Sequence, residues 1–189
     1  MGISLIVAVD ENYAIGKDNS LLYKIKGDME IFRKVTTTNQ LSEQSNIVVM
    51  GSRTFESLKS PLRDRLNVVV SRNIAYKIDE YLLNEYNIIL ENDLDKILSL
   101  YKFSGNQNRE LFVIGGSEVY SQSFQYADKI YLTMIHDNSK TADTYFPKEE
   151  LDNFEIESSE RHYDEEHDLE YSFINYVRKE NVVDFNERL

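Results

Sequence analysis

Two segments that read as buried strands run directly into turns that begin with glycine and carry residues suited to binding an anion. The first is Val49-Met50 followed by Gly51-Ser52-Arg53-Thr54, and the second is Val113-Ile114 followed by Gly115-Gly116-Ser117-Glu118. Unpaired N–H groups at a helix start attract phosphate, and glycine lets a ligand approach the backbone closely. Glycine is also the ordinary residue of a tight turn, so each motif alone leaves both interpretations open.

Three arginines lie next to predicted strands in a chain that is acidic overall. Arg53 belongs to the first glycine turn, Arg65 precedes the predicted strand 66–70, and Arg72 follows it. A guanidinium group can bind a carboxylate or a phosphate through two parallel hydrogen bonds. A single surface arginine usually balances a neighbouring carboxylate, but three at such positions, against a formal net charge of −12, favour an anionic ligand.

Asp28 is the most informative carboxylate of the chain. It follows an apolar segment ending at Ile25 and opens a helix predicted over 28–37, whose apolar face includes Phe32. An acid at a helix start is usually a cap or a partner of the helix dipole. The functional alternative is an acid in a mostly apolar pocket, where it can pair with a cationic or amidine-like heterocycle. Position alone favours the cap.

The elements that must position these residues alternate between strands and helices. Apolar runs predict strands at 3–9, 46–50, 66–70, 111–114 and 129–135, and helical patterns predict helices at 28–37, after the breaker Gly27, at 92–98 and at 117–124. Continuous apolar runs suit strands covered on both faces, so the alternation predicts a three-layer α/β fold with a mainly parallel central sheet. Residues 154–157 and 171–177 flank an acidic turn and predict a C-terminal antiparallel hairpin.

Length and composition fit one ordinary domain, which we assign to residues 1–180, with 181–189 as a C-terminal tail. No window approaches the roughly 20 apolar residues needed to span a bilayer. The apolar start lacks a basic segment before it, so no signal peptide is expected and the cytoplasm is the expected location.

The chain has no cysteine, which excludes disulfides and thiolate sites. Its three scattered histidines predict no metal site, and its acidity argues against nucleic-acid binding.

Taken in order, these motifs resemble dihydrofolate reductases over residues 3–178. The matching pieces include Ala14-Ile15-Gly16, Asp28 with Phe32, Thr54-Phe55-Glu56-Ser57, Pro61-Leu62-x-x-Arg65, Val70-Ser71-Arg72, Tyr131-Leu132-Thr133 and Asp143-Thr144-Tyr145-Phe146-Pro147, together with both glycine turns. Neither turn matches a P-loop or Gly-x-Gly-x-x-Gly, which disfavours a kinase and a standard Rossmann dehydrogenase. The resemblance implies NADPH-dependent reduction of 7,8-dihydrofolate to 5,6,7,8-tetrahydrofolate, by hydride transfer to the pterin ring, in support of one-carbon metabolism and thymidylate synthesis.

The resemblance also implies a substrate pocket. Asp28 would hold the pterin and favour its protonation through water, with Tyr23 and Thr133 as the other two catalytic residues. Phe32 and Leu62 would enclose the p-aminobenzoyl ring, and Arg65 would bind the glutamate α-carboxylate. The substrate-binding residues implied are Ile6, Asp28, Phe32, Leu58, Leu62, Arg65 and Ile114. Antifolate inhibitors would bind in the same pocket, and the protein is expected to be a monomer, as many members of this family are.

The cofactor implied is NADPH. Ala8 and Ile15 would hold the nicotinamide amide, and the two glycine turns would clasp the pyrophosphate. Ser71 and Arg72, with Arg53, match positions near the adenosine 2′-phosphate, where the positive charge of the arginines would favour NADPH over NADH. The cofactor-binding residues implied are Ala8, Ile15, Gly51, Ser52, Arg53, Thr54, Ser71, Arg72, Gly115, Gly116, Ser117, Glu118, Val119 and Tyr120.

Three positions depart from the family's pattern. Leu22-Tyr23 stands where a Pro-Trp pair is usual, Lys26-Gly27 replaces a second proline, and Ser52 replaces a basic residue. The loop from Gly16 to Gly27 should therefore be more flexible, which would affect loop closure, turnover and cofactor affinity.

Two alternative functions remain open. One is a related reductase of the riboflavin-synthesis type, which needs neither the acid nor the arginine for a glutamate tail, and the other is a non-catalytic folate-binding homologue.

Overall fold

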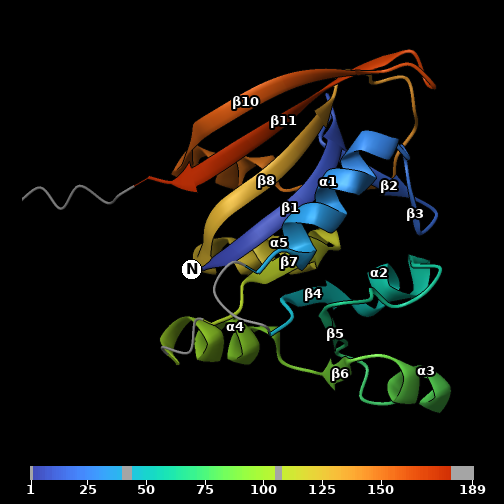
Figure 1. Ribbon diagram of the computed structural model, residues 1–189, viewed down its shortest axis with the longest axis vertical. Helices are drawn as coiled ribbons and strands as arrows, with labels where there is room; N and C mark the ends of the chain where they lie inside the picture. The colour runs from blue at the N-terminus through green and yellow to red at the C-terminus, as the bar shows by residue number, and fades with distance from the viewer. Residues whose placement is uncertain (1, 40–43, 105–107, 180–189) are drawn as a thin grey trace, which may run out of the picture.

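The computed structural model describes residues 2–39, 44–104 and 108–179. Its main sheet has eight strands in the order β10-β11-β8-β1-β7-β4-β5-β6 (Figure 1). The strands β8 to β6 of this order run parallel, whereas β11 is antiparallel to β8 and β10 is antiparallel to β11. The bounds are β1 Ile3–Asp10, β4 Ile47–Gly51, β5 Leu66–Val70, β6 Ile88–Glu91, β7 Leu111–Gly115, β8 Ala127–Ile135, β10 Phe154–Asp164 and β11 Leu169–Arg178. The predicted sheet and its C-terminal hairpin are confirmed.

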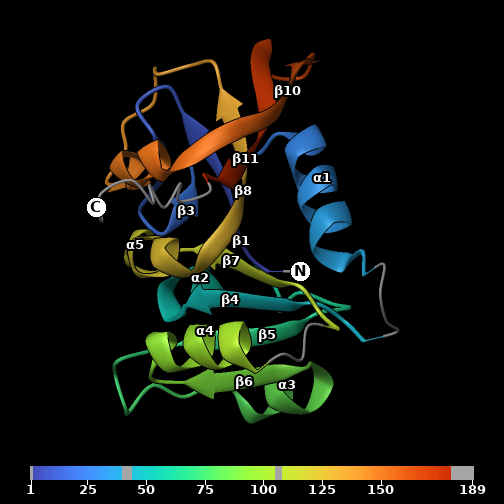
Figure 2. The same ribbon diagram turned by 90° about the vertical axis from the view of Figure 1, so that its left-hand side faces the viewer.

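Helices cover both faces of this sheet, as the alternation of elements predicts. Figure 2 shows α1 on one side and α4 and α5 on the other. The bounds are α1 Lys26–Thr37, α2 Ser52–Ser57, α3 Glu80–Glu85, α4 Leu94–Phe103 and α5 Ser117–Ser123, with two 3-10 helices, η1 Phe124–Tyr126 and η2 Lys148–Asn153. The three-layer arrangement is confirmed.

The two faces of β1 and β4 explain the continuous apolar runs in the sequence. Successive strand residues point to opposite faces. Leu5 of β1 and Val49 of β4 therefore pack with α4 and α5, whereas Ile6 and Met50 pack against the side chains of α1. Both faces exclude water, and each fully buried aliphatic side chain contributes about 1.5–3 kcal/mol.

The start of α1 differs from the sequence-based expectation. The helix begins at Lys26, its N-cap is Ile25 without a side-chain capping bond, and Gly27 is its second residue. Interpreting Gly27 as a helix breaker is therefore wrong, and Asp28 is not a cap. The N–H groups of a first helical turn have no intrahelical partner, so a glycine there weakens the helix less than one in its interior.

A second, small sheet forms beside the first. It contains β2 (Ala14–Lys17), β3 (Ser20–Leu21) and β9 (Thr144–Tyr145) in the order β3-β2-β9. These strands pair the loop after β1 with the segment after β8. The loop that resembles the family's active-site loop is thereby paired with a part of the chain far from it in sequence.

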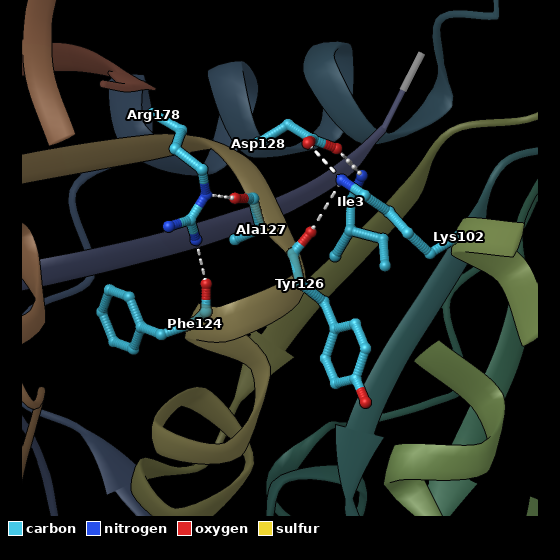
Figure 3. A network of polar contacts seen from close by, with 7 residues as sticks. All are labelled: Ile3, Lys102, Phe124, Tyr126, Ala127, Asp128 and Arg178. Carbon is cyan, nitrogen blue, oxygen red and sulfur yellow. Dashed lines mark hydrogen bonds and ion pairs between the residues drawn. The ribbon is translucent and has the colours of Figure 1, made fainter. Parts of the chain in front are cut away.

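A network of polar contacts links the residues at the amino ends of β1 and β8 to neighbouring elements (Figure 3). Asp128 accepts a hydrogen bond from the backbone N–H of Ile3 at 3.0 Å and pairs with Lys102 of α4. Arg178 of β11 donates to the carbonyl oxygen of Ala127 at 2.7 Å and to that of Phe124. The network joins the first strand, α4 and the last strand.

No helix among the described residues is long and apolar enough to cross a membrane.

Candidate active site

Asp28 and Thr133 meet across the interface between α1 and the sheet. The Thr133 hydroxyl donates a hydrogen bond to Asp28 Oδ1 at 2.6 Å. Thr133 lies on β8 directly opposite Ala8 of β1, so a residue expected at the nicotinamide is adjacent to the partner of the acid. The other carboxylate oxygen, Oδ2, makes no hydrogen bond with the described residues, which leaves it for a ligand.

The environment of Asp28 favours its protonated form. Burial raises the pKa of the Asp28 carboxyl, while the hydrogen bond from Thr133 acts in the opposite direction. Tyr120 lies near this acid: its own pKa is raised by burial and, to a smaller extent, by the Asp28 charge. The Tyr120 hydroxyl donates to the carbonyl oxygen of Ile6 at 2.8 Å. A desolvated acid with one oxygen free can accept hydrogen bonds from a cationic ligand or supply a proton.

The residues expected around the substrate's rings belong to one apolar cluster. Ile6 and Phe55 are buried in it, and four of the expected substrate contacts pack against these core residues: Phe32, Leu58, Leu62 and Ile114. They come from α1, the segment after α2, and β7, which are far apart in sequence. The structure thus brings together the apolar wall that the sequence predicted.

Arg65 lies at the far end of this apolar wall. The side chain is 7% exposed, and its guanidinium carbon is 5.9 Å from the centre of the Phe32 ring. Its Nη1 donates to Thr36 Oγ1 at 2.8 Å and its Nε to the carbonyl oxygen of Arg63 at 2.9 Å. Burial lowers the pKa of Arg65, and it pairs with no carboxylate among the described residues. A desolvated cation of this kind suits an anionic ligand group.

Tyr23 is held by the segment after β8 rather than by Asp28. Its hydroxyl donates to Asp137 Oδ2 at 2.8 Å, and the pKa of Tyr23 is raised by burial first and by Asp137 second. Lys140 lies 4.1 Å above the Tyr23 ring and donates to the carbonyl oxygen of Leu22 at 2.6 Å. The loop that lacks the family's proline is therefore anchored by side chains. The anchoring residues Asp137 and Lys140 carried no signal in the sequence.

The two glycine turns lie against each other. A Cβ on Gly115 would lie 3.1 Å from Thr54 Oγ1, and a Cβ on Gly51 would lie 3.3 Å from Val119 Cγ2. Gly115 has a φ of +138°, which only glycine adopts readily, and the peptide bond between Gly115 and Gly116 is cis. The glycines therefore let the two turns pack closely against each other, with little side-chain volume between them.

Arg72 and Glu118, both expected at the cofactor, bind each other. Arg72 Nη1 lies 2.7 Å from Glu118 Oε1, and Nη2 donates to Oε2 at 2.9 Å. Arg53 is exposed and forms no ion pair with the described residues. The ordinary interpretation of a surface arginine therefore holds for Arg72 in this structure, whereas Arg53 remains free for an anion.

The other expected cofactor residues surround the same edge. Ile15 packs against the core cluster on the α5 side, and Ser52 is the first residue of α2. The Ser71 hydroxyl accepts from the N–H of Asn73 at 3.3 Å, and the Ser117 hydroxyl donates to the carbonyl oxygen of Tyr145 at 2.7 Å. These contacts place the expected residues along the carboxyl ends of the strands, where ligands of open α/β sheets bind.

One residue beside the acid was not foreseen. Tyr171 of β11 is buried in a cluster with Tyr23, Ile25 and Ile135. A Cβ on Gly27, the residue before Asp28, would lie 2.2 Å from the Tyr171 hydroxyl oxygen. The glycine at position 27 therefore makes room for Tyr171, a requirement that no local sequence pattern indicates.

A three-layer α/β fold with a buried acid beside an apolar cluster, and with two glycine turns at the carboxyl ends of its strands, is typical of ligand-binding enzymes of the α/β class. The family model for dihydrofolate reductase matches residues 2–178. A dihydrofolate reductase of Bacillus subtilis is 34% identical over 178 residues, covering 94% of this chain and 95% of that protein. One of Haemophilus influenzae is 33% identical over 180 residues, covering 95% and 100%. The chain belongs to the dihydrofolate reductase family.

A solved structure supports the fold assignment. A dihydrofolate reductase from Enterococcus faecalis, complexed with NADP(H) and RAB-propyl, has a TM-score of 0.78 and 24% identity, and the match covers 94% of this chain and 96% of that one. Family membership makes the chain an oxidoreductase, as its sequence predicted, and does not favour the riboflavin-type or non-catalytic alternatives.

Proposed function

We propose that this chain reduces 7,8-dihydrofolate to 5,6,7,8-tetrahydrofolate with NADPH, and that Asp28 is the acid of the reaction. The observation that carries the proposal is the 2.6 Å hydrogen bond from Thr133 to one oxygen of a desolvated Asp28. This contact fixes the carboxyl group and leaves its second oxygen without a hydrogen bond to the described residues. A pterin offers a ring nitrogen and an exocyclic amine, which match a carboxyl group in geometry and charge.

Asp28 has two roles in this mechanism. Its Oδ2 accepts hydrogen bonds from the pterin and orients the ring along the apolar wall of Ile6 and Phe32. Its raised pKa keeps a proton available at the site at a higher pH than a solvated aspartate would, and this favours protonation of the reacting imine. Tyr120 is buried, and its hydroxyl holds the backbone of β1 by donating to the carbonyl oxygen of Ile6.

Arg65 and the two glycine turns bind the anionic groups of the substrate and of the cofactor. Arg65, which lacks a carboxylate partner among the described residues, binds the α-carboxylate of the substrate's glutamate. The two glycine turns would bind the pyrophosphate through their backbone N–H groups, which no side chain covers at Gly51, Gly115 and Gly116. NADPH, when bound there, supplies the hydride. The protein's contribution is to orient the reactants and exclude water.

The direct test measures NADPH oxidation by purified protein, with and without dihydrofolate. We expect oxidation only when dihydrofolate is present. Asp28→Asn should lower kcat at neutral pH by roughly 10²–10⁴-fold, the usual contribution of a positioned acid, while the dissociation constant of NADPH stays within about twofold, as expected when no cofactor contact is lost. Glu30→Gln is the matched control, because it removes one carboxylate from the exposed side of the same helix.

Two outcomes would contradict the proposal. Full activity of Asp28→Asn would exclude Asp28 as the acid. Tight binding of both ligands by the unmodified protein without turnover would favour a non-catalytic folate-binding protein.

We further propose that residues 1–180 act as one domain, as a monomer in the cytoplasm, with antifolates binding in the substrate pocket. One apolar core joins the first strand to the last helix and to Phe154 of the hairpin, which supports a single domain. Light scattering after gel filtration measures the oligomeric state, and a dimer would refute that part. The predicted tail 181–189 lies outside the described residues.

A further inference from the structure

The ion pair between Arg72 and Glu118 uses the whole outer edge of the guanidinium group. Arg72 follows β5, and Glu118 lies in the first turn of α5. Glu118 Oε1 lies 2.7 Å from Nη1, and Oε2 accepts from Nη2 at 2.9 Å. Two parallel contacts of this kind leave neither terminal nitrogen of Arg72 free on that side.

A phosphate group that approaches Arg72 must either displace Glu118 from this edge or bind the remaining Nε edge beside the carboxylate's negative charge. Arginine binds phosphate and carboxylate through the same two-pronged geometry, so one edge serves one anion at a time. NADPH and NADH differ only at the adenosine 2′ position, which is a phosphate in the first and a hydroxyl in the second. A carboxylate close to that position repels a phosphate, whereas it can accept a hydrogen bond from a hydroxyl.

We propose that Glu118 is a specificity-determining residue, whose carboxylate competes with the cofactor's 2′-phosphate for Arg72 and so reduces the preference for NADPH over NADH. The inference rests on the proposed function, because it requires a dinucleotide at this edge of the sheet. Arg53 is exposed and forms no ion pair with the described residues. Its positive charge can therefore attract the 2′-phosphate while Arg72 stays paired with Glu118.

The size of the effect follows from the exposure of the pair. The side chains of Arg72 and Glu118 are 77% and 57% exposed, so water and salt screen their attraction. Exposed ion pairs are weak, and we expect Glu118→Gln to tighten NADPH binding by about two- to fivefold. NADH does not need Arg72, so its affinity should stay unchanged or fall slightly.

The experiment titrates NADPH and NADH into the full-length protein without dihydrofolate and follows cofactor fluorescence. Four proteins are compared: the unmodified protein, Glu118→Gln, Arg72→Ala and the double variant. We expect Glu118→Gln to raise the NADPH-to-NADH affinity ratio, and to do so much less when Arg72→Ala is also present. High salt should reduce the difference. Glu80→Gln is the control, because it removes an exposed carboxylate from α3.

The outcomes separate this inference from the proposed function. An unchanged or lower affinity ratio in Glu118→Gln overturns the inference, and so does an equally large gain when Arg72→Ala is present, because Glu118 would then act without Arg72. NADPH that binds but is not oxidised with dihydrofolate contradicts only the proposed function. Failure to bind either cofactor contradicts both.

Discussion

Replacing Gly27 by alanine tests how closely the start of α1 is held beside the catalytic acid. A Cβ at this position would lie 2.2 Å from the hydroxyl oxygen of Tyr171 and 3.2 Å from its Cζ. Either the Tyr171 ring or the first turn of α1 must therefore move by about 1 Å, and Tyr171 is buried and resists displacement.

The expected loss of stability is the balance of two effects. Inserting a carbon into a packed site costs about 1–3 kcal/mol, while alanine is favoured over glycine in a helix by roughly 0.5–1 kcal/mol. We expect a net loss of up to about 2.5 kcal/mol, or a fall in Tm of up to roughly 10 °C for a protein of this size. Because a displacement of about 1 Å at a catalytic group can cost up to 10²-fold in rate, kcat/KM should fall further than stability alone explains.

Tyr171→Phe provides the matched control. The Tyr171 hydroxyl forms no hydrogen bond with the described residues, so this change alone should cost little. In combination with it, Gly27→Ala should cost much less, because the oxygen at 2.2 Å is gone and only the ring carbon at 3.2 Å remains to be accommodated. Urea denaturation of the four proteins measures the coupling free energy, and steady-state kinetics measures kcat/KM. A cost for Gly27→Ala that is the same with and without Tyr171→Phe would refute the reasoning.

Three further predictions concern single side chains. Because burial raises the pKa of Asp28, the folded protein binds a proton there more tightly than the unfolded chain, and stability falls as pH rises above about 3.9. Asp28→Asn should therefore raise the urea midpoint at pH 7 but not at pH 3, and equal shifts at both pH values would argue against a desolvated acid. Tyr23→Phe removes the bond to Asp137 and should cost about 1 kcal/mol in thermal unfolding; an unchanged Tm would mean that this bond does not anchor the loop. Arg65→Gln should raise the KM for dihydrofolate by about 10–100-fold but not that for a dihydropterin without a glutamate tail. Equal effects on both substrates would place the glutamate elsewhere.

The buried strands could be predicted from the sequence because their own residues specify them. β1, β4, β5 and β7 are continuous apolar runs covered on both faces. The helix predicted at 92–98 is α4, and its N-cap Asp93 accepts from the N–H of Lys96 at 2.9 Å. The elements missed were β2, β3, β6, β9, α3 and the 3-10 helix η2. They are short and largely exposed, so they depend on pairing with other segments and not on a local pattern. For the same reason β10 extends to Asp164, well beyond the predicted 154–157.

The candidate site was predicted from the order of motifs along the whole chain and not from any local signal. Thr133 and Asp28 are 105 residues apart, and the environment of Asp28 alone favoured a helix cap. The ion pair of Arg72 with Glu118 could not be foreseen, because it depends on how the end of β5 lies relative to α5. Likewise, Gly27 looked like a helix breaker because its real constraint, the Tyr171 hydroxyl, comes from the last strand.

The central place of β1 also governs when the chain can fold during its synthesis. β1 is the first strand to be made, yet its neighbours β7 and β8 begin only at Leu111 and Ala127. At a translation rate of about 5–20 residues per second, its apolar residues wait on the order of 5–20 s for a partner. Contacts between residues so distant in sequence also form slowly. Until β7 and β8 are made, the nascent chain therefore presents β1 as an unpaired hydrophobic strand, which is the kind of segment that chaperones bind and that aggregates when translation stalls.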